Sequence, residues 1–298
     1  MQTRTLGKTG LKVSAIGFGA AEIGFANVTV DDASRTLHAV LDAGVNFIDT
    51  AAAYLTSEEL IGQALGHRRS EVVLATKCGA VEGFSKSDWS KEGILRTVQK
   101  SLKHLKTDYV DLLFLHSCGE LEMKWGEALQ GVEAARDAGY TRFVGYSGDG
   151  PAALWAAGCG RFDVIETSLS ILDQEALSLH LPIAIKNNLG VVIKRSLGNA
   201  VWRYTAPPEN EYHLEYWKRW NALKYDFATQ DSQHIAAMAL RFTAFQPGVH
   251  CAIVGTTRPE RLRHNIELLA AGPLEPAVEQ HIRNTWKARA DQYWVGQI

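Results

Sequence analysis

Cysteine is scarce in this chain: only Cys78, Cys118, Cys159 and Cys251 occur among 298 residues. They form no CxxC pair and no zinc-type spacing, and so sparse a set in a long chain favours reduced thiols over a disulfide framework. They imply no metal site. Cys78 and Cys118 follow two predicted strand ends, where each is either a reactive thiol or a small side chain that fills space, and we favour the second interpretation.

Long apolar runs and an excess of one charge are also missing. No stretch reaches the ~20 apolar residues of a membrane span, and the segment Met1–Leu6 lacks the apolar core of a secretion signal. The formal net charge of −2 excludes a broad electrostatic footprint for nucleic acid or an anionic membrane. We therefore expect a soluble cytoplasmic protein with small-molecule partners. The composition carries no signal for an oligomeric state.

The chain does have a regular alternation of strand-like apolar runs and helical patterns, which predicts a parallel sheet with helices outside it. Its length is normal for one α/β barrel, so we expect a single domain over residues 1–298. The predicted strands are Ile16–Gly19, Asn46–Asp49, Val72–Lys77, Tyr109–His116, Thr141–Ser147, Val164–Thr167, Val191–Arg195 and Cys251–Val254. The predicted helices are Asp31–Ala43, Ser57–Leu65, Lys91–Leu105, Gly126–Ala138, Pro151–Ala157, Leu181–Asn188 and Ser232–Phe245.

Three of the apolar runs end in a polar residue that can transfer, tune or orient a proton. These runs are Val45–Asp49, Val72–Lys77 and Val110–His116, and Tyr54 follows the first by five residues. The carboxyl ends of parallel strands meet at one rim, where a barrel assembles catalysis from separate strands. We therefore expect these polar side chains to share one mouth.

The four residue types suit proton transfer. A tyrosine that titrates near ~10 in water is a poor acid at neutral pH unless a nearby ammonium favours its phenolate. Lys77 is a candidate for that ammonium, held by Asp49. Taken singly, each residue has an ordinary alternative: a helix cap for Asp49, an ion pair for Lys77, a rim aromatic for Tyr54 and a satisfied interior histidine for His116. Their repeated placement after core strands favours the functional interpretation.

In order, spacing and strand-end context, Asp49-Thr50-Ala51 with Tyr54, Lys77 and His116 resembles the catalytic tetrad of the aldo-keto reductases. The resemblance extends from Leu6–Ser14 to Gly255–Ile266. It implies a (β/α)8 TIM barrel whose lower end is plugged by an N-terminal hairpin. It also implies NAD(P)H-dependent reduction of a carbonyl, in which Tyr54 donates the proton, Lys77 and Asp49 tune it, and His116 orients the carbonyl.

The nicotinamide contacts depart from the family pattern. No Rossmann G-x-G-x-x-G is present, because Gly17–Glu22 lacks the third glycine; Gly19 more plausibly gives clearance beside a barrel cofactor. The resemblance assigns the nicotinamide to four positions, Ser147, Gly148, Glu166 and Leu169. Ser147 matches the family, whereas Gly148 stands in place of asparagine, Glu166 in place of glutamine, and Leu169 in place of an aromatic ring.

The rest of the cofactor site follows two later motifs. The resemblance implies a pyrophosphate loop that contains Arg195, Ser196, Leu197 and Gly198, and a final motif that contains Thr256, Arg261 and Asn265. Arg261 offers a planar bidentate donor to a 2′-phosphate, so NADP(H) is preferred. Gly255 and His264 replace a lysine and a glutamate that are common in the family, which leaves NAD(H) as an alternative.

A long aromatic segment, Ser196–Asp231, follows the seventh predicted strand. Its aromatic density argues against a disordered linker, and a long excursion at an active rim is a candidate substrate lid. We expect one or more of Trp202, Trp217 and Trp220 to shape the substrate pocket. The alternative is an accessory helix packed on the barrel, and both can hold.

The first function hypothesis is an NAD(P)H-dependent oxidoreductase that reduces an aldehyde, ketone or sugar carbonyl, or runs the reverse alcohol oxidation. The second is a nicotinamide-binding regulatory or interaction protein on the same fold, kept open by Glu166 and Leu169. The third is an unrelated barrel lyase or isomerase, with Lys77 as a Schiff-base amine or Glu166 as a base.

Overall fold

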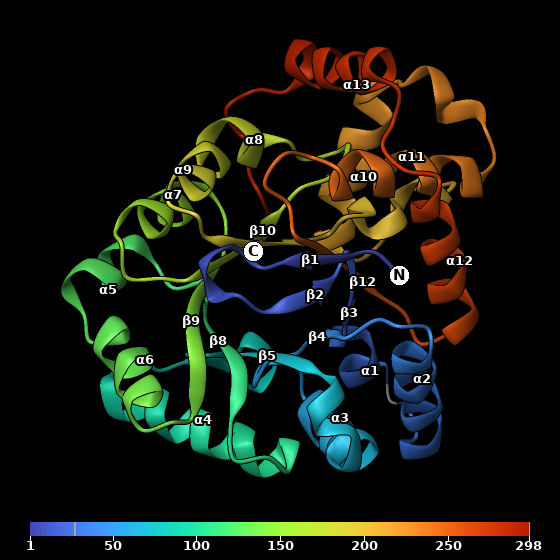
Figure 1. Cartoon of the computed structure of the whole chain (residues 1–298). Coiled ribbons are helices and arrows are strands. Elements are labelled where there is room, and N and C mark those ends of the chain that lie inside the picture. The colour runs from blue at the N-terminus through green and yellow to red at the C-terminus, as the bar shows by residue number, and fades with distance from the viewer. Residues whose placement is uncertain (27, 298) are drawn as a thin grey trace.

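Eight parallel strands form a closed barrel (Figure 1). The computed structural model describes residues 1–26 and 28–297. Neighbouring strands follow chain order around the barrel, and β12 pairs with β3 to close it. This confirms the predicted (β/α)8 barrel and all eight predicted strands. They are β3 (Ile16–Gly19), β4 (Phe47–Asp49), β5 (Val73–Cys78), β8 (Val110–His116), β9 (Thr141–Ser147), β10 (Val164–Ser168), β11 (Gly190–Lys194) and β12 (Cys251–Gly255).

The strands bury both faces in two separate apolar layers. Phe47, Val73, Leu112 and Val164 belong to a core inside the barrel, whereas the alternating residues pack between the strands and the surrounding helices. Side chains on a strand alternate with period two. Four polar residues follow these interior positions by two or four residues, and they therefore also face the lumen. They lie at the carboxyl ends of their strands and are Asp49, Lys77, His116 and Glu166.

Helices surround the barrel as the alternation predicts. The seven predicted helices are α2 (Val30–Asp42), α3 (Ser57–Leu65), α4 (Lys91–Leu105), α6 (Ala128–Asp137), α7 (Gly150–Gly158), α9 (Leu181–Lys186) and α11 (Ser232–Ala244). Side-chain caps fix several starts: Ser90 accepts from Gly93 N at α4, and Asp231 accepts from the first turn of α11. The structure adds α1 (Ala21–Phe25), α5 (Glu120–Trp125), α8 (Glu175–Leu179), α10 (Glu211–Leu223), α12 (Pro259–Ala270) and α13 (Pro276–Arg289), with 3-10 turns at Gly7–Thr9, Gly66–Glu71, Glu82–Phe84, Gly198–Arg203 and Asp226–Thr229.

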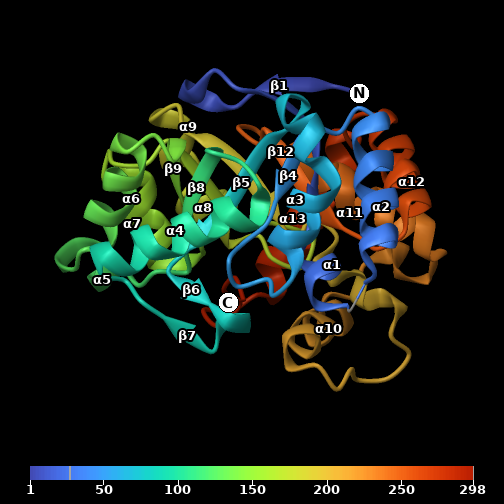
Figure 2. The same ribbon diagram turned by 90° about the horizontal axis from the view of Figure 1, so that it is seen from below.

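The N-terminal hairpin of β1 (Thr3–Thr5) and β2 (Lys12–Ser14) covers one end of the barrel (Figure 2). Leu6, Leu11 and Val13 join the interior core there, which confirms the predicted hairpin. Gly7 allows the close fit, because its φ is +47° and a Cβ at this position would lie 2.4 Å from Gly190 N.

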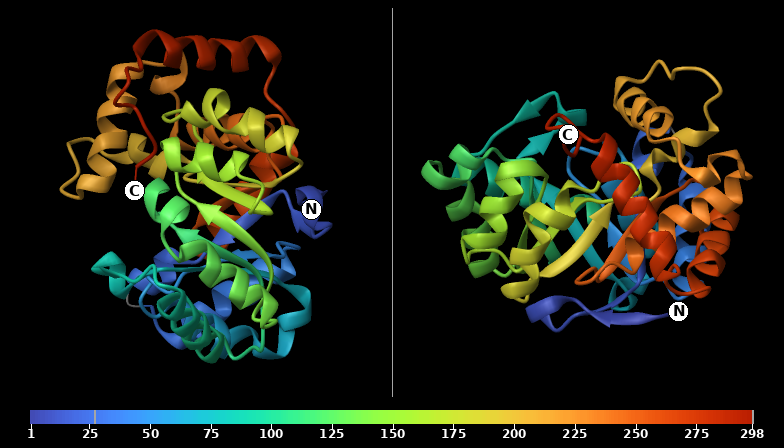
Figure 3. Two further views of the ribbon diagram at one scale, coloured as in Figure 1. Left: turned by 90° about the vertical axis from the view of Figure 1, so that its left-hand side faces the viewer. Right: turned by 90° about the horizontal axis from the view of Figure 1, so that it is seen from above.

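The opposite end of the barrel carries the larger excursions. Figures 2 and 3 place α1, α10 and the antiparallel pair β6 (Ala80–Val81) and β7 (Lys86–Ser87) on the side away from the hairpin. The segment Ser196–Asp231 therefore lies at the carboxyl rim and contains an accessory helix, α10. None of the helices within residues 1–26 and 28–297 is long and apolar enough to cross a membrane.

Candidate active site

The structure brings Asp49, Tyr54, Lys77 and His116 together at the carboxyl rim. Lys77 Nζ donates to both carboxylate oxygens of Asp49, at 2.6 and 2.5 Å, and to the Thr50 carbonyl at 3.0 Å. The hydroxyl of Tyr54 lies 3.4 Å from the same nitrogen. The ring of His116 meets that of Tyr54 edge-on, with 5.6 Å between the ring centroids. One lysine therefore links the tyrosine to a carboxylate, with an imidazole beside them.

Lys77 carries a compensated charge in the interior. Its side chain is fully buried, and burial alone lowers the pKa of an amine. The carboxylates of Asp49 and Glu166 outweigh that effect and raise the pKa of Lys77 above its usual value. The amine is therefore a committed ammonium, whereas a Schiff-base lysine must present a neutral nitrogen. This geometry disfavours the lyase hypothesis.

Tyr54 is held as a neutral phenol. Burial raises the pKa of Tyr54, and Lys77 lowers it by a smaller amount. Asp49 and Glu166 raise it further, so the net direction is upward. The expected influence of Lys77 is thus present but smaller than desolvation. The tyrosine keeps its proton until a bound group changes the local field.

His116 is a neutral imidazole. Burial lowers the pKa of His116 well below its usual value, and the cations Lys77, Lys194 and Arg195 lower it further. His116 is buried, with only 6% of its surface exposed, and its Nδ1 still has no hydrogen-bond partner among the described residues. A neutral ring has one N–H donor, which is what orienting a single carbonyl oxygen requires.

Glu166 contacts Lys77 directly, a contact that the sequence analysis does not predict. Its Oε1 lies 3.5 Å from Lys77 Nζ and accepts from Ser147 Oγ at 2.9 Å. Its Oε2 has no partner in the described chain. The signal was available in principle, because Glu166 follows the interior residue Val164 by two positions and pairs in register with Ser147.

Two phenylalanines that sequence reasoning missed pack on the tetrad. Phe25 of α1 lies 5.9 Å from the Tyr54 ring, and Phe84 lies 6.2 Å from Tyr54 and 4.9 Å from His116 between ring centroids. Both are half exposed, at 47% and 48%, as is Leu55 at 54%. Phe84 and Leu55 also have positive φ, of 70° and 45°, which is unfavourable for bulky residues. These side chains form an apolar entrance beside the reacting groups.

Two of the three predicted tryptophans belong to an aromatic cluster separate from the tetrad. The ring centroids of Trp202 and Trp220 lie 5.9 Å apart, and the Trp220 ring also packs on Tyr225 and Phe227. Trp217 donates to the carbonyl of Tyr204. Two hydrogen bonds join α10 to the barrel rim: Arg195 Nε donates to the hydroxyl of Tyr212, and the hydroxyl of Tyr216 donates to Asp173 at 3.1 Å.

The residues predicted to bind the cofactor differ in how many contacts they already make within the protein. Arg195 donates to Ser168 and pairs with Asp149 at 3.3 Å, and Ser196 donates to the Ile253 carbonyl at 2.8 Å. Arg195 is not the last residue of β11 as predicted but follows it with φ of 60°. Leu197 and Gly198 continue this turn, and the Gly19 backbone pairs with Gly255 of β12. The pyrophosphate candidates are therefore fixed by the barrel itself.

The packing of Tyr146 explains why glycine stands at position 148. A Cβ at this position would lie 2.4 Å from the hydroxyl of Tyr146, which is buried and donates to the Cys118 carbonyl. Tyr146 thus fills the space from which an asparagine side chain would start. Leu169 is fully buried in the outer core.

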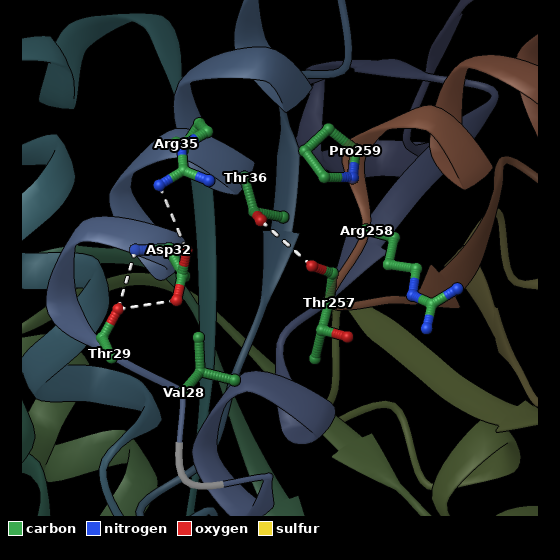
Figure 4. Close-up of a pocket in the computed structure, with 8 residues that line it drawn as sticks. All are labelled: Val28, Thr29, Asp32, Arg35, Thr36, Thr257, Arg258 and Pro259. Atoms are coloured by element: carbon green, nitrogen blue, oxygen red, sulfur yellow. Dashed lines mark hydrogen bonds and ion pairs between the residues drawn. The ribbon is translucent and has the colours of Figure 1, made fainter.

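The final cofactor motif borders a pocket of about 310 Å³ between α2 and the turn into α12 (Figure 4). Thr36 donates to the Thr257 carbonyl across it, and the guanidinium of Arg35 turns to Asp32 at 3.1 Å. Thr256 accepts from Arg258 N, and Asn265 is buried. Arg261 is exposed and makes no ion pair within the described chain. Its guanidinium is available to an anion.

The thiols near the site are buried. Cys78 and Cys118 are both 0% exposed, and burial raises the pKa of each thiol above its usual value. This supports a packing role over a reactive one. Within residues 1–26 and 28–297, no group of three His, Cys, Asp or Glu residues is arranged to hold a metal ion.

Known proteins resemble this chain along most of its length. A family model described as the Aldo/keto reductase family matches residues 15–287. L-galactose dehydrogenase of Arabidopsis thaliana is 30% identical over 283 residues, covering 89% of this chain and 87% of that protein. A probable voltage-gated potassium channel subunit beta of the same species is 28% identical over 308 residues, covering 92% and 93%. The holo structure of aldo-keto reductase AKR11C1 from Bacillus halodurans superposes with a TM-score of 0.80 at 27% identity, covering 99% of both chains.

Proposed function

This chain belongs to the aldo/keto reductase family, and we propose that it interconverts a small carbonyl compound and its alcohol with a nicotinamide cofactor, NADP(H) in preference to NAD(H). The observation that carries the proposal is the contact of one buried ammonium, Lys77, with both the carboxylate of Asp49 and the hydroxyl of Tyr54. A structural ion pair alone has no need of a tyrosine hydroxyl at the entrance of a barrel.

The residues at the rim fit such a cofactor. His116 Nδ1 and Glu166 Oε2 are buried polar atoms without partners among the described residues, and both lie on lumen-facing side chains at strand ends. When bound, the nicotinamide supplies or accepts a hydride. Ser147 and Glu166 would hold its amide, with Gly19 and Gly148 giving clearance beside the ring.

The protein's own part is to place and move one proton. Tyr54 donates its phenolic proton to the carbonyl oxygen as hydride adds to the carbon, and takes a proton back in the reverse direction. Lys77 stabilises the negative charge that develops on the Tyr54 oxygen, and Asp49 holds Lys77 in place. His116, being neutral, donates to the same carbonyl oxygen and sets its angle.

The outer parts of the cofactor would bind along the neighbouring strands. We assign the pyrophosphate to Arg195, Ser196, Leu197 and Gly198. The adenosine end would contact Thr256, Arg261 and Asn265, and the preference for a 2′-phosphate rests on the exposed Arg261 guanidinium. Because Arg195 already pairs with Asp149 and Ser168, its contribution would come through the turn that it starts, with main-chain donors rather than a free charge.

The substrate would enter past Phe25 and Phe84, which pack on the tetrad, and past the exposed Leu55, which follows Tyr54 in the chain. Trp202, Trp217 and Trp220 remain candidates for the outer pocket wall, because their segment lies on the same rim. The name of the relative L-galactose dehydrogenase makes aldoses the first compounds to test, since aromatic faces stack on the CH faces of sugars as readily as they cover apolar carbonyl compounds.

Titration with NADP⁺, NADPH, NAD⁺ and NADH, followed by an assay panel of aldehydes, ketones and aldoses in both directions, tests this proposal. Cofactor-dependent turnover that Tyr54→Phe abolishes supports it. The likeness to a channel beta subunit favours one competing function, cofactor binding for regulation. Tight cofactor binding without turnover on any compound of the panel would support that competing function.

A further inference from the structure

Glu166 places a second carboxylate on the lysine at the centre of the site. Its side chain is 1% exposed, with Oε1 at 3.5 Å from Lys77 Nζ and 2.9 Å from Ser147 Oγ. Its Oε2 has no partner among the described residues. A buried carboxylate oxygen without a donor is costly. This oxygen is therefore available to a bound group at the rim.

A hydride donor has to sit close to this carboxylate. Lys77 Nζ lies 3.4 Å from the Tyr54 hydroxyl and 3.5 Å from Glu166 Oε1, so the tyrosine and the glutamate flank one nitrogen. Reacting atoms approach to roughly 3–3.5 Å before transfer. A ring that exchanges hydride with a carbonyl at the Tyr54 hydroxyl therefore lies within a few ångströms of Glu166. This step rests on the proposed function.

Two carboxylates share the one ammonium at the centre of the site. Lys77 supplies one positive charge, and Asp49 already satisfies it through both carboxylate oxygens. Glu166 adds a second carboxylate. Lys194 and Arg195 both pair with Asp149, at 3.1 and 3.3 Å. A buried carboxylate that shares its ammonium with another carboxylate favours a further cation beside it. An oxidised nicotinamide ring is positively charged, and a reduced ring is neutral.

We propose that Glu166 is a specificity-determining residue that makes the site bind the oxidised nicotinamide in preference to the reduced one. Glutamine at position 166 would keep the hydrogen-bond geometry and remove the charge.

The test is the ratio of dissociation constants for NADP⁺ and NADPH, measured by calorimetry on the full chain without substrate. Glu166→Gln is expected to shift this ratio toward NADPH by about 10- to 100-fold, the scale for a unit charge near the ring at intermediate dielectric. Glu166→Asp keeps the charge and should retain most of the preference for NADP⁺. The same pair measured with NAD⁺ and NADH should show the same shift.

Glu58→Gln is the matched control. Glu58 is also buried, and it accepts from Thr76 on the outer face of β5, opposite the side on which Lys77 lies. It should leave the ratio unchanged. A Glu166→Gln protein with the wild-type ratio overturns this inference while the proposed function stands. Loss of the preference in Glu166→Asp as well as in Glu166→Gln would also overturn it, because shape rather than charge would then set the ratio. Wild-type protein that binds none of the four cofactors overturns the proposed function itself.

Discussion

Removing the ammonium of Lys77 should destabilise the fold as well as the chemistry. In Lys77→Met the carboxylates of Asp49 and Glu166, each 1% exposed, lose the cation that both contact. Removing one partner of a buried ion pair costs about 3–5 kcal/mol. For a chain of this size that corresponds to a fall in Tm on the order of 10 °C. Methionine keeps an unbranched side chain of similar length, so the loss reflects charge more than volume.

The double variant Asp49→Asn/Lys77→Met separates charge from packing. It removes the uncompensated Asp49 carboxylate, so the two substitutions should be less harmful together than their separate effects predict, with a coupling energy of about 2–3 kcal/mol. Urea unfolding followed by tryptophan fluorescence measures this, because the chain contains eight tryptophans. Equal m-values would show that the same surface unfolds in each variant.

The pH dependence of stability is a second test of the loss of the Lys77 ammonium. Burial, and then Glu166, raise the pKa of Asp49 in the folded protein, whereas Lys77 lowers it. Without Lys77 the pKa rises further. A carboxyl whose folded pKa is raised stabilises the fold at low pH and loses that contribution as pH rises. The deficit in stability of Lys77→Met relative to wild type should therefore grow as pH rises and the Asp49 carboxyl loses its proton. Strictly additive single and double variants, or a deficit that shrinks as pH rises, would refute this reasoning.

Four further predictions follow from the site and its surroundings. Tyr54→Phe should keep cofactor affinity and lose most turnover, since only the acidic hydroxyl is removed; comparable turnover when chemistry is rate-limiting would reject Tyr54 as the acid. Arg261→Ala should weaken NADPH by about 1.5–3 kcal/mol and spare NADH, as measured by titration; an equal loss for both cofactors would point to a shared contact. Phe84→Ala should change selectivity among carbonyl compounds more than Trp202→Ala does, and neither variant should change cofactor affinity. A larger change in selectivity for Trp202→Ala would place the pocket on α10. Burial raises the pKa of Glu58 to about 7, so its contribution to wild-type stability should fall by roughly 3 kcal/mol as pH rises from about 4.5 through 7. Midpoints of urea unfolding measured across this pH range should therefore change less with pH in Glu58→Gln than in wild type. A Glu58→Gln profile equal to that of wild type would count against this prediction.

The sequence was informative where local pattern and burial coincide. Continuous apolar runs predicted all eight barrel strands, since strands buried on both faces carry no polar alternation. The polar residue that ends each of three runs predicted the gathering of Asp49, Lys77 and His116. Their distances follow from the barrel, because period-two alternation turns each one into the lumen with the interior residues before it.

Contacts between loops of different strands were beyond such reasoning. Phe25 follows β3 and Phe84 follows β5, and neither has a periodic context that distinguishes it from an ordinary surface aromatic. The excursion after β11 was predicted as a rim element, and α10 lies there, but tertiary packing decided that Trp202 and Trp220 face one another. The bond between Glu166 and Lys77 needed the register of β9, β10 and β5 together.

The fit between Tyr146 and Gly148 also constrains how this chain can be altered. Asparagine introduced at 148 alone collides with the tyrosine hydroxyl at 2.4 Å, and shortening Tyr146 alone leaves a cavity and removes the donor to the Cys118 carbonyl. Each single exchange is therefore harmful, whereas the pair can be tolerated. The two positions form an epistatic unit, so an engineer who transplants a relative's nicotinamide site, or a lineage that drifts toward it, must change both residues together.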